Sequence, residues 1–280
     1  MGAEKMTAED RTLATKALAT ATDVETREEL LDENGKPRPV FMEIYAANAR
    51  RYMAATGATA ADFADVVAKN TRNGSLNPIA QIRTPVSREE VLSARQIVDP
   101  LTRPMCAGIG DGAAAIVLCS SKFAREKGLK GPKVRTTVLG SAERENNQEI
   151  VSKTARRLYE AAGIAPTDVS LVELHDAASP AELMVPEELS LVPPGGGPEL
   201  IRSGASQIGG RLPINPSGGL TARGHPIGAT GAAQIIELAN QLRGRCGPRQ
   251  VETARIGLAE NAGGSIFGGA AACMLTILEA

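Results

Sequence analysis

The chain has 280 residues, 42% of them hydrophobic, and a formal net charge of −1. A nearly neutral charge gives no electrostatic case for nucleic acid or an anionic membrane as the main partner. With no Trp, four Phe and three Tyr, few side chains are present to stack on bases or sugars. The length allows one large domain or two of ordinary size, and we favour two similar α/β halves.

The four cysteines, Cys106, Cys119, Cys246 and Cys273, are widely spaced and show no metal-binding pattern, so no metal site is predicted. Cys119 and Cys273 lie in apolar runs that are typical of buried strands. We therefore expect reduced thiols in a soluble, cytoplasmic protein. No segment reaches the apolar length of a membrane span, and residues 1–30 lack the core of a signal peptide.

The beginning of the chain favours helices. Residues 1–35 are polar with a weak helical pattern, and their abrupt charged start does not resemble the start of a domain. Apolar side chains at helical spacing predict a helix over residues 40–56 that ends at Gly57. Thr59 and Asp62 then form a close relative of the capping box, which opens a second helix.

Loops and short elements follow. Residues 70–85 contain Asn-Gly and Asn-Pro, which form turns, and are predicted to be a polar loop. Ser87 is a plausible cap for a short helix, and residues 97–101 are predicted to be extended. The apolar run over residues 109–120 predicts a strand that is covered on both faces. A short helix over residues 122–128 completes this part.

A domain boundary is placed at Gly131-Pro132, which separates residues 1–131 from residues 132–280. Strands and helices alternate after it. Strands are predicted over residues 134–141, 169–175, 255–260 and 271–278, with helices over 147–163, from Pro180 and after Pro226. This alternation predicts an α/β fold with mixed, mostly parallel sheets and helices on both faces.

A glycine-rich stretch over residues 215–234 carries one of the two histidines, His225, into the start of an apolar helix. Five glycines between Gly218 and Gly231 remove the Cβ where the backbone turns or approaches a neighbour closely. The free N–H groups at a helix start favour negative charge, so His225 is a candidate active-site residue. The alternative is a glycine-rich connection with a structural histidine.

Three loops are expected to meet at one site. In parallel sheets, functional residues gather beyond the carboxyl ends of strands. His175 ends a predicted strand, His225 precedes a predicted helix, and residues 261–264 follow another strand. We therefore expect these three segments to lie together.

These motifs make the chain resemble the thiolase family, and within it most the sterol-carrier-protein thiolases and the lipid-transfer thiolase-like proteins. Residues 175–178 (HDAA) are similar to the His-Asp-Cys-Phe box, residues 215–231 resemble the Gly-His-Pro box, and residues 260–264 (ENAGG) stand where the last active-site loop belongs. Residues 70–81 and 111–115 also resemble family landmarks. The resemblance implies a thiolase-like fold in which residues 1–131 are the remainder of an incomplete N-terminal half with its loop region, and residues 132–280 the C-terminal half.

The resemblance also implies roles. Thiolases form or cleave a carbon–carbon bond next to an acyl-CoA thioester, whose carbonyl becomes an oxyanion or enolate that positioned donors stabilise. His225 would donate to that oxygen and tune the nucleophile, and His175 would help to hold the water or substrate carbonyl. The Gly263 N–H matches a second oxyanion donor, Asp176 would orient its neighbours, and Asn261 occupies the position of the acid/base cysteine.

The glycine loop is the expected contact for coenzyme A, through Ser217, Gly218 and Gly219. No bound cofactor is expected beyond the coenzyme A thioester that serves as substrate. By analogy with the family, a homodimer and a small OB-fold partner protein are the expected protein partners, with no nucleic acid and no membrane span.

Three departures from the family pattern bear on the chemistry. The acylated cysteine of the family belongs to a region expected to precede Met1, and Asn261 and Ala177 leave neither proton-transfer position with a thiol. Ala178 also replaces the aromatic residue of its box. We therefore expect the chain alone to be inactive as a thiolase.

Four functions remain open from the sequence. The first is a thiolase-type acyltransferase of lipid or sterol metabolism, an acetyl-CoA acetyltransferase-like activity of the full-length product. The second is a retro-aldolase subunit that works with an OB-fold partner and needs no acyl-enzyme. The third is a non-catalytic acyl-CoA or lipid-binding protein, and the fourth is a fragment without activity of its own.

Overall fold

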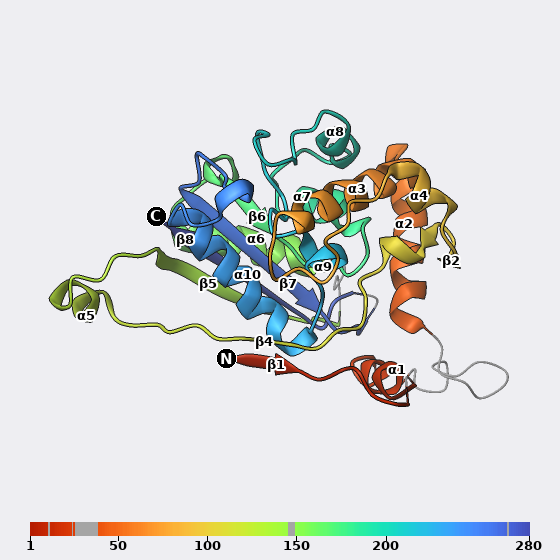
Figure 1. The fold of residues 1–280 in the computed structure, drawn as a ribbon, viewed down its shortest axis with the longest axis horizontal. Coiled ribbons are helices and arrows are strands. Elements are labelled where there is room, and N and C mark those ends of the chain that lie inside the picture. Colours follow the sequence, from red (N-terminus) through yellow and green to blue (C-terminus); the bar gives the residue numbers. More distant parts are fainter. Residues whose placement is uncertain (11, 24, 26–38, 145–148, 268) are drawn as a thin grey trace.

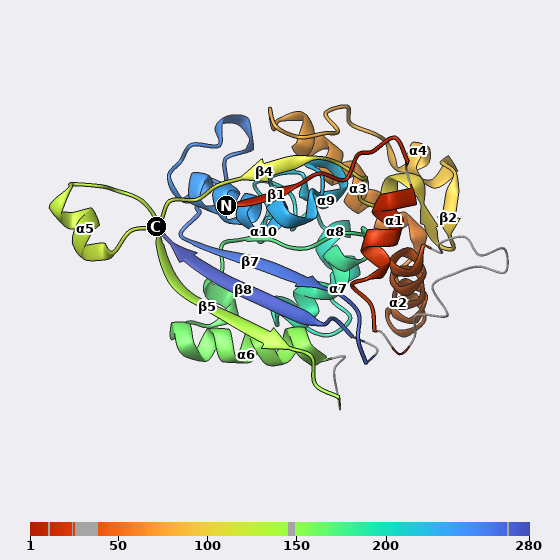
Figure 2. The same ribbon diagram turned by 90° about the horizontal axis from the view of Figure 1, so that it is seen from below.

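The computed structural model describes residues 1–280 apart from 11, 24, 26–38, 145–148 and 268. Its centre is a four-stranded sheet in the order β5-β8-β7-β6. The strands are β5 (Lys133–Ser141), β6 (Leu171–Glu173), β7 (Ile256–Gly263) and β8 (Ala272–Glu279). Helix α6 (Ile150–Ala162) covers one face and α10 (Ile227–Leu242) the other (Figures 1 and 2). The α/β class is confirmed.

The sheet is mixed, as predicted, but the prediction that it is mostly parallel is wrong. Only β6 and β7 run parallel, whereas β8 pairs antiparallel with both β5 and β7. The reason lies in the connections: β7 turns directly into β8, while helices α7 to α10 separate β6 from β7. A short connection joins antiparallel neighbours, and parallel neighbours need a long crossover. Strand β6 is also shorter than predicted and ends before His175.

A second layer of helices lies beside the sheet (Figure 1). It contains α2 (Val40–Thr56), α3 (Ala60–Ser75), α4 (Arg88–Ser93), α7 (Ala181–Glu188) and α8 (Gly197–Arg202). The predicted ends are confirmed: Gly57 closes α2 in the left-handed conformation, and capping boxes open α3 and α4. Phe63, Val66 and Leu101 pack at the centre of this layer with no exposed surface. Within the described part of the chain, no helix is long and apolar enough to cross a membrane.

The predicted loop over residues 70–85 begins too early, because α3 continues to Ser75. Asn and Gly are weak helix formers. Here the amides of Asn70, Asn73 and Asn77 instead hydrogen-bond to groups of other buried segments. These tertiary bonds outweigh the local preference and dock the end of α3 onto the glycine loop, where the short helix α9 (Gly219–Ala222) lies.

The segment before β5 departs most from prediction. Instead of a buried strand over residues 109–120, only β4 (Gly112–Ala114) forms, paired with β1 (Gly2–Glu4). Val117 and Leu118 are 96% and 73% exposed, and Cys119 is exposed as well, so their predicted burial is wrong. Among the described residues nothing covers them, and the chain extends outward to α5 (Ser121–Glu126) (Figure 1). The remaining elements are α1 (Thr12–Ala19) and the pair β2 (Gln96–Val98) and β3 (Leu101–Thr102).

The main apolar core lies between α6 and the sheet. Leu158 of α6, Leu258 of β7 and Leu275 of β8 are fully buried there. Burying a large aliphatic side chain stabilises the fold by about 1.5–3 kcal/mol. This core supports the ends of β6 and β7, from which the residues of the candidate site extend.

Candidate active site

The structure brings the two histidines into contact. His175 stands two residues after the end of β6, and His225 stands two residues before α10. Their rings meet edge to face, with centroids 4.9 Å apart and an interplanar angle of 78°. His175 also lines a cavity together with residues 263–265. The three predicted segments therefore approach one another, although only His175 and the loop at residues 263–265 line the cavity itself.

His225 is held by the first turn of its helix. Its Nδ1 lies 2.8 Å from Thr230 Oγ1, and that hydroxyl donates to the Pro226 carbonyl oxygen at 3.0 Å. A hydroxyl has one proton, so in this arrangement Nδ1–H donates to Thr230 and Nε2 carries a lone pair. Burial lowers the pKa of His225 to about 3, helped by His175 and the positive charge of Arg223. The ring is therefore neutral at physiological pH.

His175 is held from β7. Its backbone N–H donates to Glu260 Oε2 at 2.8 Å, which ties the end of β6 to the neighbouring strand. Burial lowers the pKa of His175 to about 4. A neutral imidazole donates from one nitrogen and accepts at the other, so the site presents two uncharged rings that each keep a donor and an acceptor nitrogen.

Asp176 lies behind the histidines and has no exposed surface. Its carboxylate accepts the Leu220 N–H at 2.7 Å and the Asn70 amide at 3.0 Å, which links β6, the glycine loop and α3. Burial raises the pKa of Asp176 well above its usual value, and the neighbouring Glu182 adds to this. These contacts join the three segments, and the orienting role of Asp176 stays a prediction.

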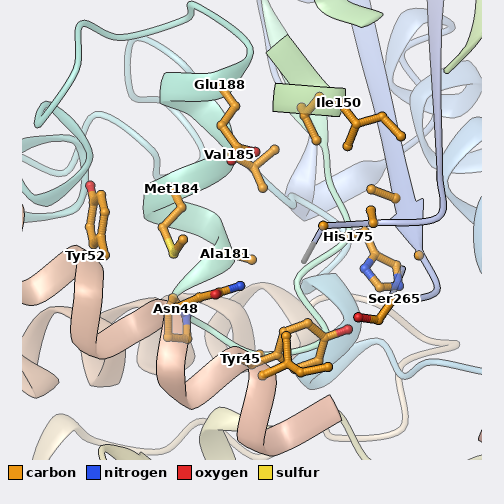
Figure 3. Close-up of a pocket in the computed structure, with 18 of the residues that line it drawn as sticks. Tyr45, Asn48, Tyr52, Ile150, His175, Ala181, Met184, Val185, Glu188 and Ser265 are labelled. Carbon is orange, nitrogen blue, oxygen red and sulfur yellow. The ribbon is translucent and has the colours of Figure 1, made fainter. Parts of the chain in front are cut away.

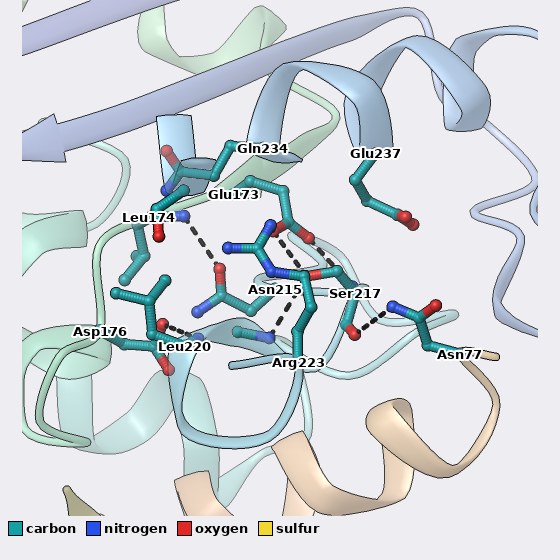
Figure 4. A network of polar contacts seen from close by, with 12 residues as sticks. Asn77, Glu173, Leu174, Asp176, Asn215, Ser217, Leu220, Arg223, Gln234 and Glu237 are labelled. Atoms are coloured by element: carbon teal, nitrogen blue, oxygen red, sulfur yellow. Dashed lines mark hydrogen bonds and ion pairs between the residues drawn. The ribbon is translucent and has the colours of Figure 1, made fainter. Parts of the chain in front are cut away.

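Ser217 is buried in a second network, shown in Figure 4. Its N–H and hydroxyl donate to the two oxygens of Glu173, at 2.9 and 2.7 Å, and its carbonyl accepts the Asn77 amide at 2.9 Å. Gly218 and Gly219 have φ values of +102° and +60°, which favour glycine. All three residues lie inside the protein, so the predicted contact with coenzyme A stays a prediction.

Asn215 opens the glycine loop and crosslinks its surroundings. Its Oδ1 accepts the Leu174 N–H at 2.9 Å, and its Nδ2 donates to Glu182 at 3.1 Å. Glu182 also pairs with Lys69 of α3, whose Nζ lies 2.5 Å away and reaches the Ile214 carbonyl at 2.6 Å. This buried ion pair fixes the position from which the loop departs toward His225.

Asn261 and Gly263 take different orientations. The Asn261 amide donates to Gln234 Oε1 of α10 at 2.9 Å, and Gln234 donates in turn to the Glu260 carbonyl. Asn261 is thus directed toward α10 and is absent from the residues that line the cavity, whereas Gly263 is one of them. The predicted roles of both residues stay predictions.

The cavity has a volume of about 450 Å³ and lies between α2, α7 and the end of β7. Figure 3 shows His175, Ser265 and the hydroxyl of Tyr45 near one another at one end, with Met184 and Val185 along one wall. Two acidic residues also line it, Glu188 and Glu260. Among the described residues, no group of three or more His, Cys, Asp or Glu is arranged to hold a metal ion.

Several buried charged groups near the site carry no predicted role. These are Lys69, Glu173, Glu182, Arg223 and Glu260. Arg223 lies 3.7 Å from Glu173 and is 6% exposed. In the sequence, Glu173 and Glu260 are each the single carboxylate of a mostly apolar stretch, residues 169–174 and 256–260. Such a group is costly to bury without partners, so it indicates a built network.

Comparison with known proteins identifies the family. Residues 134–276 match the family model described as thiolase C-terminal domain-like. The chain is 44% identical over 215 residues to the benzoylsuccinyl-CoA thiolase subunit BbsB of Thauera aromatica, covering 74% of this chain and 56% of that protein. It is 40% identical over 278 residues to an acetyl-CoA acetyltransferase of Methanothermobacter thermautotrophicus, covering 97% of this chain and 70% of that protein. Bovine sterol carrier protein 2 is 38% identical, and the chain covers 44% of it.

Solved structures agree. The Ltp2-ChsH2(DUF35) aldolase has a TM-score of 0.72 at 25% identity, covering 85% of this chain and 63% of that one. The SCP2-thiolase like protein type 1 of Mycobacterium smegmatis has a TM-score of 0.60 at 19% identity, covering 84% and 51%, and shows the same fold. The chain thus spans between about half and two thirds of several of these proteins. It belongs to the thiolase family.

Proposed function

We propose that this chain binds a coenzyme A thioester and promotes the making or breaking of the carbon–carbon bond next to its carbonyl. The contact between two neutral imidazoles carries this proposal. The thioester oxygen gains negative charge as the enolate forms, and donors fixed in a dry site stabilise that charge far better than water does. His175 and Gly263 line the cavity, and in this proposal the His175 ring and the Gly263 N–H are these donors.

His225 has a different part in this proposal. With Nδ1–H donating to Thr230, its Nε2 is free to accept a hydrogen bond from an attacking thiol or a substrate hydroxyl. The start of α10 lies beside this ring and favours negative charge on the sulfur of the thiol or the oxygen of the hydroxyl. In this proposal His175 is the donor to the carbonyl oxygen and His225 is the hydrogen-bond acceptor.

Calorimetric titration tests the proposal directly. Acetyl-CoA should bind more tightly than free coenzyme A. His175→Asn should weaken acetyl-CoA binding by about 5- to 150-fold, the loss expected for a buried hydrogen bond of about 1–3 kcal/mol, whereas His225→Asn, which removes only an acceptor, should weaken it less. Free coenzyme A should bind all three proteins alike. Absence of acetyl-CoA binding by the unaltered chain would refute the proposal.

A retro-aldolase that works with a partner protein is the second candidate. Two observations favour it: the likeness to the Ltp2-ChsH2(DUF35) aldolase, and Ala177 and Asn261 at the two positions where the family pattern carries thiols. None of the four cysteines lines the cavity. Cleavage of a β-hydroxyacyl-CoA after addition of an OB-fold partner would support this candidate, and thiolysis of acetoacetyl-CoA by the chain alone would contradict it.

A further inference from the structure

Strand β7 sends two neighbouring residues to opposite sides of the sheet. Side chains alternate along a strand, so Glu260 and Ala262 share one face and Asn261 has the other. The contacts agree, since Glu260 and Ala262 line the cavity while Asn261 bonds to Gln234 of α10. Glu260, and not Asn261, therefore presents its functional group to the cavity.

The Glu260 carboxyl is placed beside the histidine pair. Glu260 is 1% exposed, and its Oε2 accepts the backbone N–H of His175 at 2.8 Å, so the carboxyl lies against the backbone of that histidine. The other titratable groups near it are Glu188 and Tyr45 across the cavity and Cys273 on β8. No cation is among the groups that shift the proton affinity of Glu260.

Carbon–carbon chemistry next to a thioester needs a group that exchanges a proton with the α-carbon. The residues in the family's two proton-transfer positions, Ala177 and Asn261, have no proton to exchange near neutral pH. Burial lowers the pKa of His225 to about 3 and that of His175 to about 4, which makes both poor bases. Burial raises the pKa of Glu260 to about 7, and a catalytic acid or base works best when its pKa lies near the operating pH.

We propose that Glu260 is the catalytic acid and base of this site and exchanges the α-proton of the bound thioester. This inference rests on the proposed function. In the forward step, the carboxylate takes a proton from the α-carbon, the C–H electron pair becomes the enolate double bond, and the carbonyl electrons move to the oxygen beside His175. In cleavage, the breaking Cα–Cβ bond supplies that electron pair, and the Glu260 carboxylic acid returns the proton to the α-carbon.

Exchange of the acetyl-CoA methyl protons in D₂O tests this step without any nucleophile or second substrate. Proton NMR follows the loss of the methyl signal with the 280-residue chain present. The rate should rise with pH through about 7, as Glu260 ionises. Glu260→Gln should slow exchange by about 100-fold or more, the usual contribution of a positioned acid or base.

The glutamine variant separates catalysis from positioning. Its amide oxygen still accepts the His175 N–H, so binding of acetyl-CoA should stay within about 3-fold of the unaltered chain, on the order of 0.5 kcal/mol. Glu260→Asp should recover part of the exchange, and Glu252→Gln, the same change at an exposed position, should leave it unaltered. Circular dichroism confirms folding of each variant.

The outcomes distinguish this inference from the proposed function. If the chain binds acetyl-CoA but does not exchange its protons, or if Glu260→Gln exchanges at the unaltered rate, the role of Glu260 is wrong and the binding proposal stands. If the unaltered chain does not bind acetyl-CoA, both are wrong. Loss of binding in Glu260→Gln would assign Glu260 a structural role and also overturn the inference.

Discussion

Gly218 tests how tightly the glycine loop is packed on α3. Its φ of +102° is unfavourable for any residue with a Cβ. A Cβ there would lie 2.9 Å from Gly74 Cα and 3.1 Å from the Asn70 carbonyl oxygen. Both are backbone atoms of a buried helix, so no side chain can rotate away. Gly218→Ala should therefore cost about 1–3 kcal/mol in backbone strain and about 1–3 kcal/mol in overpacking.

Gly244 provides the matched control. It also has a positive φ, +67°, but a Cβ there meets nothing within 4 Å. Gly244→Ala should cost only the conformational strain, about 1–2 kcal/mol. Urea unfolding followed by circular dichroism measures both, and the difference in midpoint reports the steric contact together with the extra backbone strain at a φ of +102°. Equal destabilisation by the two substitutions would refute the packing described here.

Three further predictions follow from the charges and thiols. Lys69→Met should lower the free energy of unfolding by about 3–5 kcal/mol, because it leaves Glu182 buried without its cation. Arg88→Met breaks an exposed ion pair and should cost at most about 1 kcal/mol. Thermal melts of the two variants measure both values. Iodoacetamide under native conditions should label Cys119 alone, as mass spectrometry would show, because the other three thiols are buried. Folding raises the pKa of Glu260 from 4.5 to about 7, so the protonated side chain contributes to the free energy of unfolding below pH 4.5, and this contribution is lost as the pH rises through about 7. The loss amounts to about 3 kcal/mol and should be absent in Glu260→Gln, which has no proton to release. Identical profiles of stability against pH for the two proteins would contradict this.

Local signals in the sequence were sufficient for the end of α2 and for the starts of α3 and α4. The capping boxes at Thr59 and Ser87 and the left-handed Gly57 depend on residues within one turn, so the pattern alone predicts them. The continuation of α3 through Asn70 depends on hydrogen bonds to groups more than 100 positions away, which no local pattern contains. The prediction that Val117 is buried was wrong for a similar reason, because an apolar run forms a buried strand only where other elements cover it.

In the candidate active site, too, local patterns predicted some features, and others depend on contacts between distant segments. His175 and His225 were predicted to converge because both follow or precede regular elements at one edge of the sheet, and their rings do meet. The opposite orientations of Glu260 and Asn261 depend on where β7 begins its pairing, since a shift of one residue exchanges the two faces. The motif placed the segment correctly, and the pairing register decided which side chain reaches the cavity.

The histidine pair offers the most direct test of the central claim, that His175, kept neutral beside a neutral His225, polarises a thioester carbonyl at this site. The chain contains only two histidines, so a carbon–proton NMR spectrum of the ring Cε1 positions has two signals. In the free protein neither signal should titrate until the pH falls below about 5, because burial lowers the pKa values of the rings to about 4 and about 3. Acetyl-CoA should shift both signals with one dissociation constant, and by more than free coenzyme A does. Titration of either ring near its ordinary pKa, or equal shifts with acetyl-CoA and free coenzyme A, would contradict the claim.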